Sequence, residues 1–154
     1  MKFSTREDIE APAAFVFDAV SDFAAFERQA LRRGADVRRV DQGPVIVGSA
    51  WDIAFQFRNK DRRMRAVVAT LDAPNALTVD SVASGIDGIT KVELVALSPK
   101  RTRIAVSIEL SAKTLSARLL LQSLKLAKAA LTKRFKSRIA EQASTIEERY
   151  RRGS

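Results

Sequence analysis

The sequence predicts an α+β protein in which a curved antiparallel sheet of about seven strands wraps a long, basic C-terminal helix. Two observations carry this prediction. Between residues 37 and 110, apolar and polar residues alternate with a period of two, and short turn-forming segments interrupt the alternation. From Lys113 to about Arg149 the chain has no Pro or Gly and is rich in Leu, Ala, Lys and Arg, which favour helix.

The first part of the chain predicts one strand and two short helices. Residues 2–10 alternate as a strand does, and Pro12 suits the first turn of a helix over Ala13–Val20, because proline has no N–H that would need a partner there. Ser21 or Asp22 is expected to cap a second short helix, which ends near Gly34.

Six further strands, joined by short turns, predict an antiparallel meander. Their expected ranges are 37–40, 48–58, 62–71, 77–84, 89–97 and 103–110. In the second of these, one face carries Trp51, Ile53, Phe55 and Phe57.

The next strand has two alternative apolar faces. Met64, Ala66 and Val68 are the expected neighbours of the aromatic face, and the competing face is Arg65, Val67 and Ala69. A slip by one residue would exchange the two faces, so the sequence leaves this choice open.

The C-terminal helix is expected over residues 113–150. At about 1.5 Å per residue it would be roughly 50 Å long. Its apolar face is broad at first and narrows after Leu131. This pattern predicts that the first half lies inside the curve of the sheet and that the last part protrudes.

Length and composition predict one domain spanning residues 1–154, located in the cytosol. The chain has no Cys, its start has no apolar segment typical of a signal peptide, and no apolar run approaches the roughly 20 residues of a membrane span.

The chain also has no His. Serine or cysteine nucleophiles activated by His, and zinc sites built on His, are therefore excluded. We expect no cofactor and no metal, and any acid or base would be an Asp, Glu or Lys side chain or Tyr150.

The net charge of +9 is unevenly distributed. Residues 113–154 hold 11 Lys and Arg against 3 Glu. A charge confined to one element creates a directional field, which predicts contact with a polyanion through Lys125, Lys128, Lys133 and Lys136; the alternative is a solvated face. The basic segment has few aromatic residues for stacking on bases, so we expect an anionic membrane surface rather than nucleic acid.

Several short motifs resemble those of the START/Bet v 1-like (SRPBCC) superfamily, in its polyketide cyclase/dehydrase-like bacterial branch. They are Ile9-Glu10-Ala11-Pro12, Phe15-Val16-Phe17, Ser21-Asp22-Phe23, the 48–57 strand with its early Trp51, and Leu71-Asp72-Ala73-Pro74. Where many members have Trp-Pro after Asp-Phe, this chain has Ala24-Ala25. The resemblance implies the helix-grip fold and a space between sheet and long helix; members bind many ligands and a few catalyse reactions.

We therefore expect the chain to bind or carry an apolar small molecule or lipid between sheet and helix. The candidate ligand-binding residues are Trp51, Ile53, Phe55, Phe57, Met64, Ala66, Val68, Leu120, Leu124, Ala127 and Leu131. The alternative for the same residues is a solid core without a cavity.

Two other functions stay open. In a cyclase- or isomerase-type enzyme, Asp52 or Glu93 would act as a base at the pocket floor, its pKa raised by burial. Separately, Arg63, Arg65, Asp80 and Glu93 are expected either to fix the carboxylate of a ligand or to form cross-strand ion pairs on the solvent face. In an interaction protein, the basic helix would contact a membrane or nucleic acid.

Overall fold

The computed structural model describes residues 1–153, which form seven strands and four helices. The strands are β1 (Lys2–Ile9), β2 (Asp36–Arg39), β3 (Ala50–Phe57), β4 (Lys60–Asp72), β5 (Ala76–Ala83), β6 (Ile86–Ser98) and β7 (Arg101–Ala112). The helices are α1 (Ala13–Val20), α2 (Phe23–Arg32), α3 (Leu115–Lys125) and α4 (Lys128–Gly153). The predicted α+β helix-grip architecture is confirmed.

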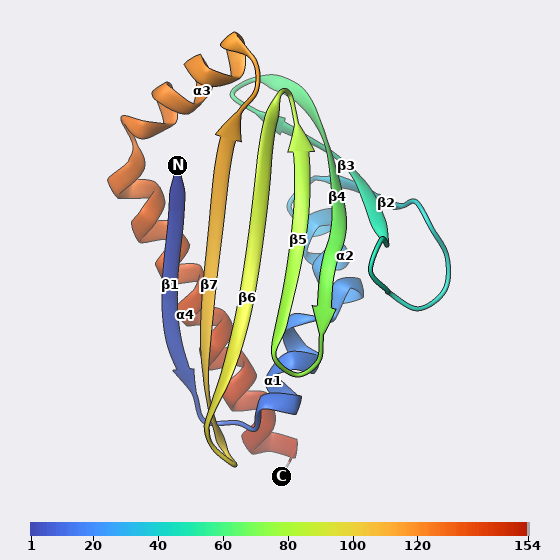
Figure 1. Ribbon diagram of the computed structural model, residues 1–154, viewed down its shortest axis with the longest axis vertical. Helices are drawn as coiled ribbons and strands as arrows, with labels where there is room; N and C mark the ends of the chain where they lie inside the picture. The colour runs from blue at the N-terminus through green and yellow to red at the C-terminus, as the bar shows by residue number, and fades with distance from the viewer. Residues whose placement is uncertain (154) are drawn as a thin grey trace.

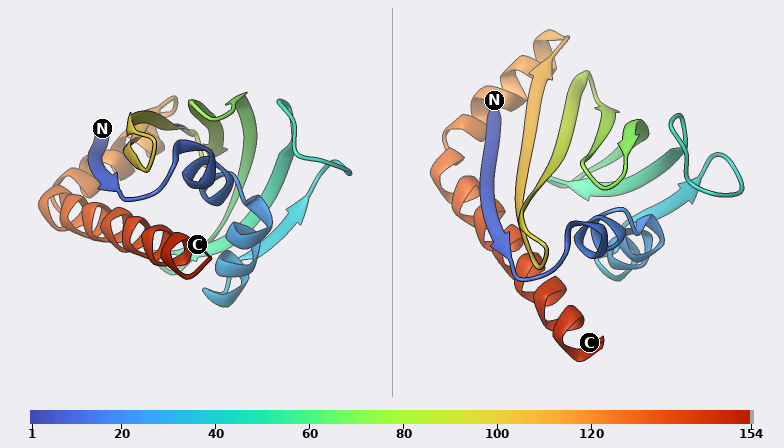
Figure 2. Two further views of the ribbon diagram at one scale, coloured as in Figure 1. Left: turned by 90° about the horizontal axis from the view of Figure 1, so that it is seen from below. Right: turned by 60° about the horizontal axis from the view of Figure 1, so that its bottom comes forward.

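All seven strands belong to one antiparallel sheet in the order β1-β7-β6-β5-β4-β3-β2. Strands β2 to β7 form a meander, and β1 pairs with β7 at the far edge. The sheet is strongly curved, and α1, α2 and α4 lie on its concave side (Figures 1 and 2). None of the helices within residues 1–153 is long and apolar enough to cross a membrane.

The pairing of β3 with β4 decides which face of β4 joins the aromatic face of β3. Trp51 pairs with Ala66 and Ile53 pairs with Met64, so these side chains lie on the same, concave face. Ala66 and Val68 are buried there. Arg65 and Val67 consequently point to the convex face.

The turn between β5 and β6 differs from the prediction. It consists of Ser84 and Gly85, which have φ values of 51° and 79°, so β6 begins at Ile86 rather than residue 89. Gly88, expected in the turn, lies within β6 opposite Ser81. A Cβ atom on Gly88 would lie 2.6 Å from Ser81 Oγ, so a residue without a side chain is needed here for the Ser81 side chain to fit against β6.

The buried core lies between the sheet, α1 and the second half of α4. Its members are Ile9, Ala11, Val16, Phe17, Leu77, Leu94, Ile104, Val106, Ala143 and Ile146. Tyr150, near the end of α4, packs edge-on against Phe15 with ring centroids 5.1 Å apart. The expectation of a protruding tail is therefore wrong for this part of the helix, which is anchored in the core.

The C-terminal helical segment is not continuous: α3 and α4 are separated by a turn at Leu126 and Ala127. In α3 the buried residues are Ala117 and Leu121, whereas α4 buries a stripe that starts at Leu131 and Phe135. α3 packs against β7, whereas α4 packs against β1 and α1. The turn gives the two helices these different directions, and this packing overrides the local helix propensity.

Candidate functional site

The concave face contains two small apolar hollows. The first, of about 200 Å³, lies between α2 and the β2–β3 edge of the sheet. Its lining consists of Phe23, Phe26, Glu27, Ala30, Val37, Trp51, Ile53, Ala66 and Val79. The exposed surface of this lining is almost entirely apolar, although Glu27 is one of the lining residues. Such a surface matches an apolar ligand.

The second hollow, of about 170 Å³, lies between α3 and the β3–β4 hairpin. Phe55, Phe57 and Met64 line it from the sheet, and Leu120 and Leu124 line it from α3. Trp51 and Ile53 of the same β3 face line the first hollow, so successive inward residues of one strand contribute to both.

Eight of the eleven expected ligand-binding residues line one of the two hollows. Val68 is fully buried on the same face, beyond the lining. Ala127 is exposed in the turn between α3 and α4, and Leu131 is half-buried on α4; neither borders a hollow. These two were placed by assuming one straight helix, and the turn at residues 126–127 moves them away.

Helix α2 forms the outer wall of the first hollow. Its N-terminus is capped by Asp22, whose Oδ1 accepts a hydrogen bond from the backbone N–H of Ala25 at 3.1 Å. Phe23, the first helical residue, stacks on Trp51 with ring centroids 5.0 Å apart and an interplanar angle of 27°. The aromatic wall is therefore fixed from both the helix and the sheet.

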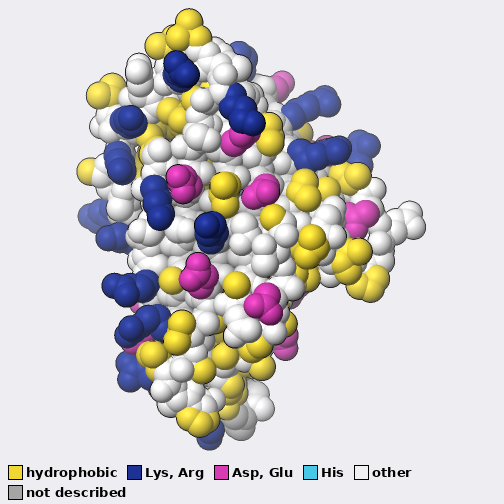
Figure 3. Space-filling view, in the orientation of Figure 1, with side chains coloured by type: hydrophobic (Ala, Val, Ile, Leu, Met, Phe, Trp, Pro, Cys, Tyr) yellow, Lys and Arg dark blue, Asp and Glu magenta, His cyan; other side chains and the backbone are white. Residues whose placement is uncertain are grey.

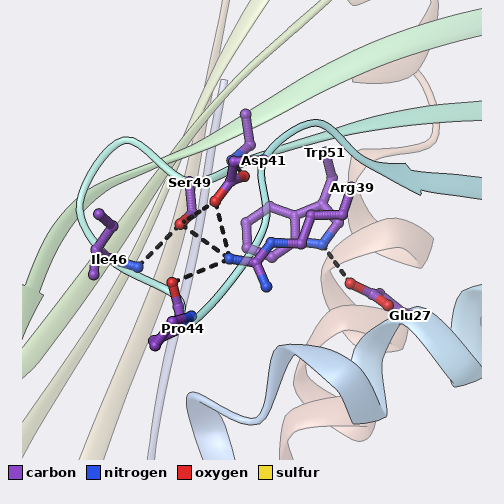
Figure 4. Close-up of polar contacts among 8 residues, drawn as sticks. Glu27, Arg39, Asp41, Pro44, Ile46, Ser49 and Trp51 are labelled. Atoms are coloured by element: carbon purple, nitrogen blue, oxygen red, sulfur yellow. Dashed lines mark hydrogen bonds and ion pairs between the residues drawn. The ribbon is translucent and has the colours of Figure 1, made fainter.

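Trp51 is held by two charged residues that the sequence did not single out. Its indole Nε1 donates a hydrogen bond of 2.5 Å to Glu27 Oε1 on α2, and the guanidinium of Arg39 lies over its ring at 5.7 Å (Figure 4). Glu27 is four residues after Phe23, so helical spacing places both on one face of α2. That spacing is the signal that could have identified Glu27.

Arg39 also joins a polar network that closes the loop between β2 and β3 (Figure 4). Its Nη2 donates to Asp41 Oδ2 at 2.9 Å and to the Pro44 carbonyl at 3.2 Å. Asp41 accepts further hydrogen bonds from the Ser49 hydroxyl and the Ala50 N–H, both at 2.9 Å. The hydrogen bond from Arg39, followed by that from Ala50, holds the pKa of Asp41 well below its ordinary value.

The carboxylates expected at the pocket floor lie elsewhere, which corrects that expectation. Asp52 is exposed on the convex face in a two-pronged ion pair with Arg65, at 2.7 and 2.8 Å. The hydrogen bond from Arg65 lowers the pKa of Asp52, whereas a buried base would need a raised pKa. Glu93, Arg63 and Asp80 are exposed on this same face, since strand residues alternate between faces.

The four lysines expected to contact a polyanion are all exposed. Lys125 ends α3, Lys128 begins α4, and Lys133 and Lys136 follow on α4. Among residues 1–153, the salt bridges of the structure do not include any of them. Their charges are therefore available to a partner.

Neither a comparison with known family profiles nor one with curated protein sequences found a match. Comparison with solved structures found similar folds over nearly the whole chain. The aromatase/cyclase Zhui from a Streptomyces species has a TM-score of 0.66 at 11% identity, covering 97% of this chain and 94% of its own. Norcoclaurine synthase from Thalictrum flavum, in complex with dopamine and hydroxybenzaldehyde, has a TM-score of 0.64 at 15% identity, covering 95% and 85%.

A START superfamily protein from Mycobacterium smegmatis is also similar, with a TM-score of 0.55 at 15% identity and coverage of 86% of this chain and 95% of its own. At sequence identities this low, the comparisons show the fold alone. The fold of this chain is the START/SRPBCC-like helix-grip fold, as the sequence motifs predicted.

Proposed function

We propose that the protein binds or carries an apolar small molecule on the concave face of its sheet, with the hollow beside Trp51 as the primary site. The observation that carries this proposal is the lining itself: aromatic and aliphatic side chains from α2, β2, β3, β4 and β5 surround a space that exposes almost no polar atoms. Apolar surface left open to water is costly, and a ligand that covers it is favoured.

The size of the hollow limits the ligand. Sites for drug-sized molecules usually measure about 300–1,000 Å³, whereas this one measures about 200 Å³. One aromatic ring system, such as a naphthyl group, fits such a space, and the rest of a larger ligand would extend beyond it. A longer apolar molecule lying along β3 would reach from Trp51 to Phe55 and so contact both hollows. Two of the similar folds, an aromatase/cyclase and an enzyme crystallised with small phenolic compounds, support this ligand class by analogy.

The enzyme alternative has less support from the geometry. Asp52 and Glu93, the bases considered from the sequence, face solvent on the convex side. Glu27 is the carboxylate nearest the first hollow, and one of its oxygens is engaged by Trp51. Binding needs only the apolar lining, and so it is the function that the observed residues support best.

Binding of N-phenyl-1-naphthylamine, a neutral apolar dye, tests the proposal. Trp51 is the single tryptophan of the chain, so energy transfer from tryptophan to dye reports binding to the protein, and the variants below locate the site. We expect saturable transfer with one dye per protein. Ala30→Phe, which fills the hollow from α2, should abolish it. The matched control Ala24→Phe, on the exposed side of the same helix, should leave it unchanged.

Unsaturable or absent energy transfer in the wild-type protein would overturn the proposal. So would equal binding by Ala30→Phe and Ala24→Phe, because the dye would then occupy a place outside the hollow. Circular dichroism of both variants checks that the helix and sheet are intact.

A further inference from the structure

Helix α3, together with Leu126 at its C-cap, carries apolar side chains on two opposite sides. Leu120 and Leu124 face the second hollow, while Leu115, Leu119 and Leu126 are 74%, 58% and 93% exposed. At about 100° per residue, the three exposed leucines fall within about 40° of one another around the helix. Single exposed leucines are common on protein surfaces, but a continuous stripe of them marks an interaction site. We name these three residues the leucine stripe.

Cationic residues border the leucine stripe on both sides. Arg118 and Lys125 follow one edge, about 60–80° around the helix from Leu115. On the other edge, Arg58 of the β3–β4 hairpin donates a hydrogen bond of 2.5 Å to Ser123 Oγ. Figure 3 shows hydrophobic and Lys/Arg side chains interspersed at the end of the molecule formed by α3.

The hairpin extends the same surface. Phe57 at its tip is 38% exposed, and the guanidinium groups of Arg58 and Arg62 lie over its ring at 5.6 and 5.7 Å. Asp61 is the one acidic residue at the tip of this hairpin, between Phe55 and Met64, and its carboxylate accepts a hydrogen bond from Gln56. The hairpin therefore adds an aromatic side chain and a net positive charge beside the leucine stripe.

The start of α3 is fixed, so the leucine stripe has a defined orientation. Thr114 Oγ1 caps the helix by accepting a hydrogen bond from the Ala117 N–H at 3.1 Å. The Lys113 N–H donates to the carbonyl of Gly85 in the β5–β6 turn at 2.8 Å. Ala117 and Leu121 are buried beneath the helix. The leucines consequently point outward without any rearrangement of the protein.

We propose that α3 and the β3–β4 hairpin form a docking surface for an anionic lipid bilayer. The leucine stripe and Phe57 would enter the boundary between headgroups and acyl chains, and Arg58, Arg62, Arg118 and Lys125 would contact lipid phosphates. An apolar stripe bordered by cations is the arrangement of helices that lie in a membrane interface. Docking of this kind also brings the second hollow, whose wall is α3, next to the bilayer.

Charge also argues against a second copy of the chain as the occupant. A two-fold dimer brings the same surface of both partners together, so the cations beside one stripe would meet those beside the other. Like charges in contact disfavour such a pairing, whereas anionic lipids neutralise them. The lipid bilayer is therefore the partner that fits both the leucines and their borders.

Co-sedimentation with vesicles tests the apolar part of the proposal. The vesicles contain phosphatidylcholine with two-fifths phosphatidylglycerol, and pure phosphatidylcholine vesicles serve as the neutral reference. We expect the triple variant Leu115→Ser, Leu119→Ser and Leu126→Ser to bind the anionic vesicles at least about tenfold more weakly than the wild type. The matched control is Val82→Ser, Val95→Ser and Leu97→Ser, which removes exposed apolar side chains from the convex face and should change binding less than twofold.

Two further double variants test the position of the charges. Both carry the same net charge and differ only in where the cations are replaced. Arg118→Glu with Lys125→Glu should abolish binding, while Lys91→Glu with Lys100→Glu, exposed on the convex side and a distant turn, should reduce it only modestly. Raising the salt concentration should weaken wild-type binding, since screening shortens the range of the attraction.

Three results would overturn the proposal. The first is a wild-type protein that does not sediment with the anionic vesicles at low salt. The second is equal binding by the leucine-stripe triple variant and its control. The third is a wild-type dimer in analytical ultracentrifugation that the triple variant converts to monomer, which would assign the stripe to self-association. Should the triple variant fail to fold, Leu126→Ser is compared with Val95→Ser in the same assay. The Leu126 side chain is almost fully exposed, so this single substitution leaves the fold intact.

Discussion

At the scale of single residues, Trp51 lies where three elements meet. Phe23 and Glu27 reach it from α2, and Arg39 covers its ring from β2. The alternation in the sequence placed Trp51 on the apolar face of its strand, and this was sufficient to nominate it. Arg39 and Glu27 could not be found in the same way, because the pairing of β2 with β3 and the position of α2 are tertiary features.

Removal of the Glu27 carboxylate should destabilise the protein. In Glu27→Ala the buried indole N–H of Trp51 loses its acceptor, which costs about 1–3 kcal/mol in the free energy of unfolding. Glu27→Gln keeps an acceptor oxygen and should lose less than half of that amount. Urea unfolding followed by Trp51 fluorescence measures both. Equal losses in the two variants would show that the hydrogen bond has no role.

Asp41 gives the loop between β2 and β3 a defined pH dependence. Its folded-state pKa is lowered, chiefly by the hydrogen bond from Arg39, so its contribution to stability is complete above the ordinary Asp pKa of about 3.9. That contribution declines as the pH falls toward the folded-state pKa. Asp41→Asn should therefore be less stable than the wild type at neutral pH, and the difference should narrow below about pH 4.

Urea unfolding midpoints at neutral pH and at about pH 3 measure this effect. Other carboxylates with lowered pKa values, such as Asp8 and Asp52, titrate equally in both proteins and cancel in the difference. The control is Asp18→Asn, at an exposed position on α1, which should show little difference at either pH. A difference for Asp41→Asn that is the same at both pH values would contradict the role given to its ionisation.

At the scale of elements, α3 and α4 show where sequence patterns stop being informative. Residues 113–149 contain no Pro or Gly and are rich in helix-favouring residues, so a single helix was the natural prediction. The break at residues 126–127 arises because α3 packs on β7 and α4 packs on β1 and α1, two directions that no local signal encodes. For the same reason the sequence did not reveal that Leu115, Leu119 and Leu126 are exposed.

The anchoring of α4 is testable with a pair of isoleucines. Ile146 is buried in the core cluster, and Ile146→Ala should lower the free energy of unfolding by about 2–5 kcal/mol through lost apolar contacts and a residual cavity. Ile46, in the loop between β2 and β3, is exposed, and Ile46→Ala should change stability by no more than about 0.5 kcal/mol. Thermal or urea unfolding compares them. If Ile146→Ala were as stable as Ile46→Ala, the end of α4 would not be part of the core.

At the scale of the whole molecule, the sequence was most informative about the sheet. Period-two alternation and turn residues predicted all seven strands. The observed boundaries differ by a few residues, for example at β6, where Gly88 lies in the strand rather than in the preceding turn. The two separate faces follow from the same alternation: apolar side chains on the concave side and ion pairs such as Arg65–Asp52 on the convex side. The depth of the hollows could not be predicted, because it depends on where α2 and α3 come to rest.

The central claim, that an apolar ligand occupies the hollow beside Trp51, is tested most directly by nuclear magnetic resonance. The single tryptophan gives one indole N–H signal in a ¹⁵N-labelled sample, and this group lies at the wall of the hollow. On titration with N-phenyl-1-naphthylamine, we predict that this signal and the amide signals of Ile53 and Ala30 shift together and saturate, while those of Glu93 and Lys91 on the convex face stay fixed. Saturable dye binding that leaves the Trp51 indole signal unchanged would contradict the account.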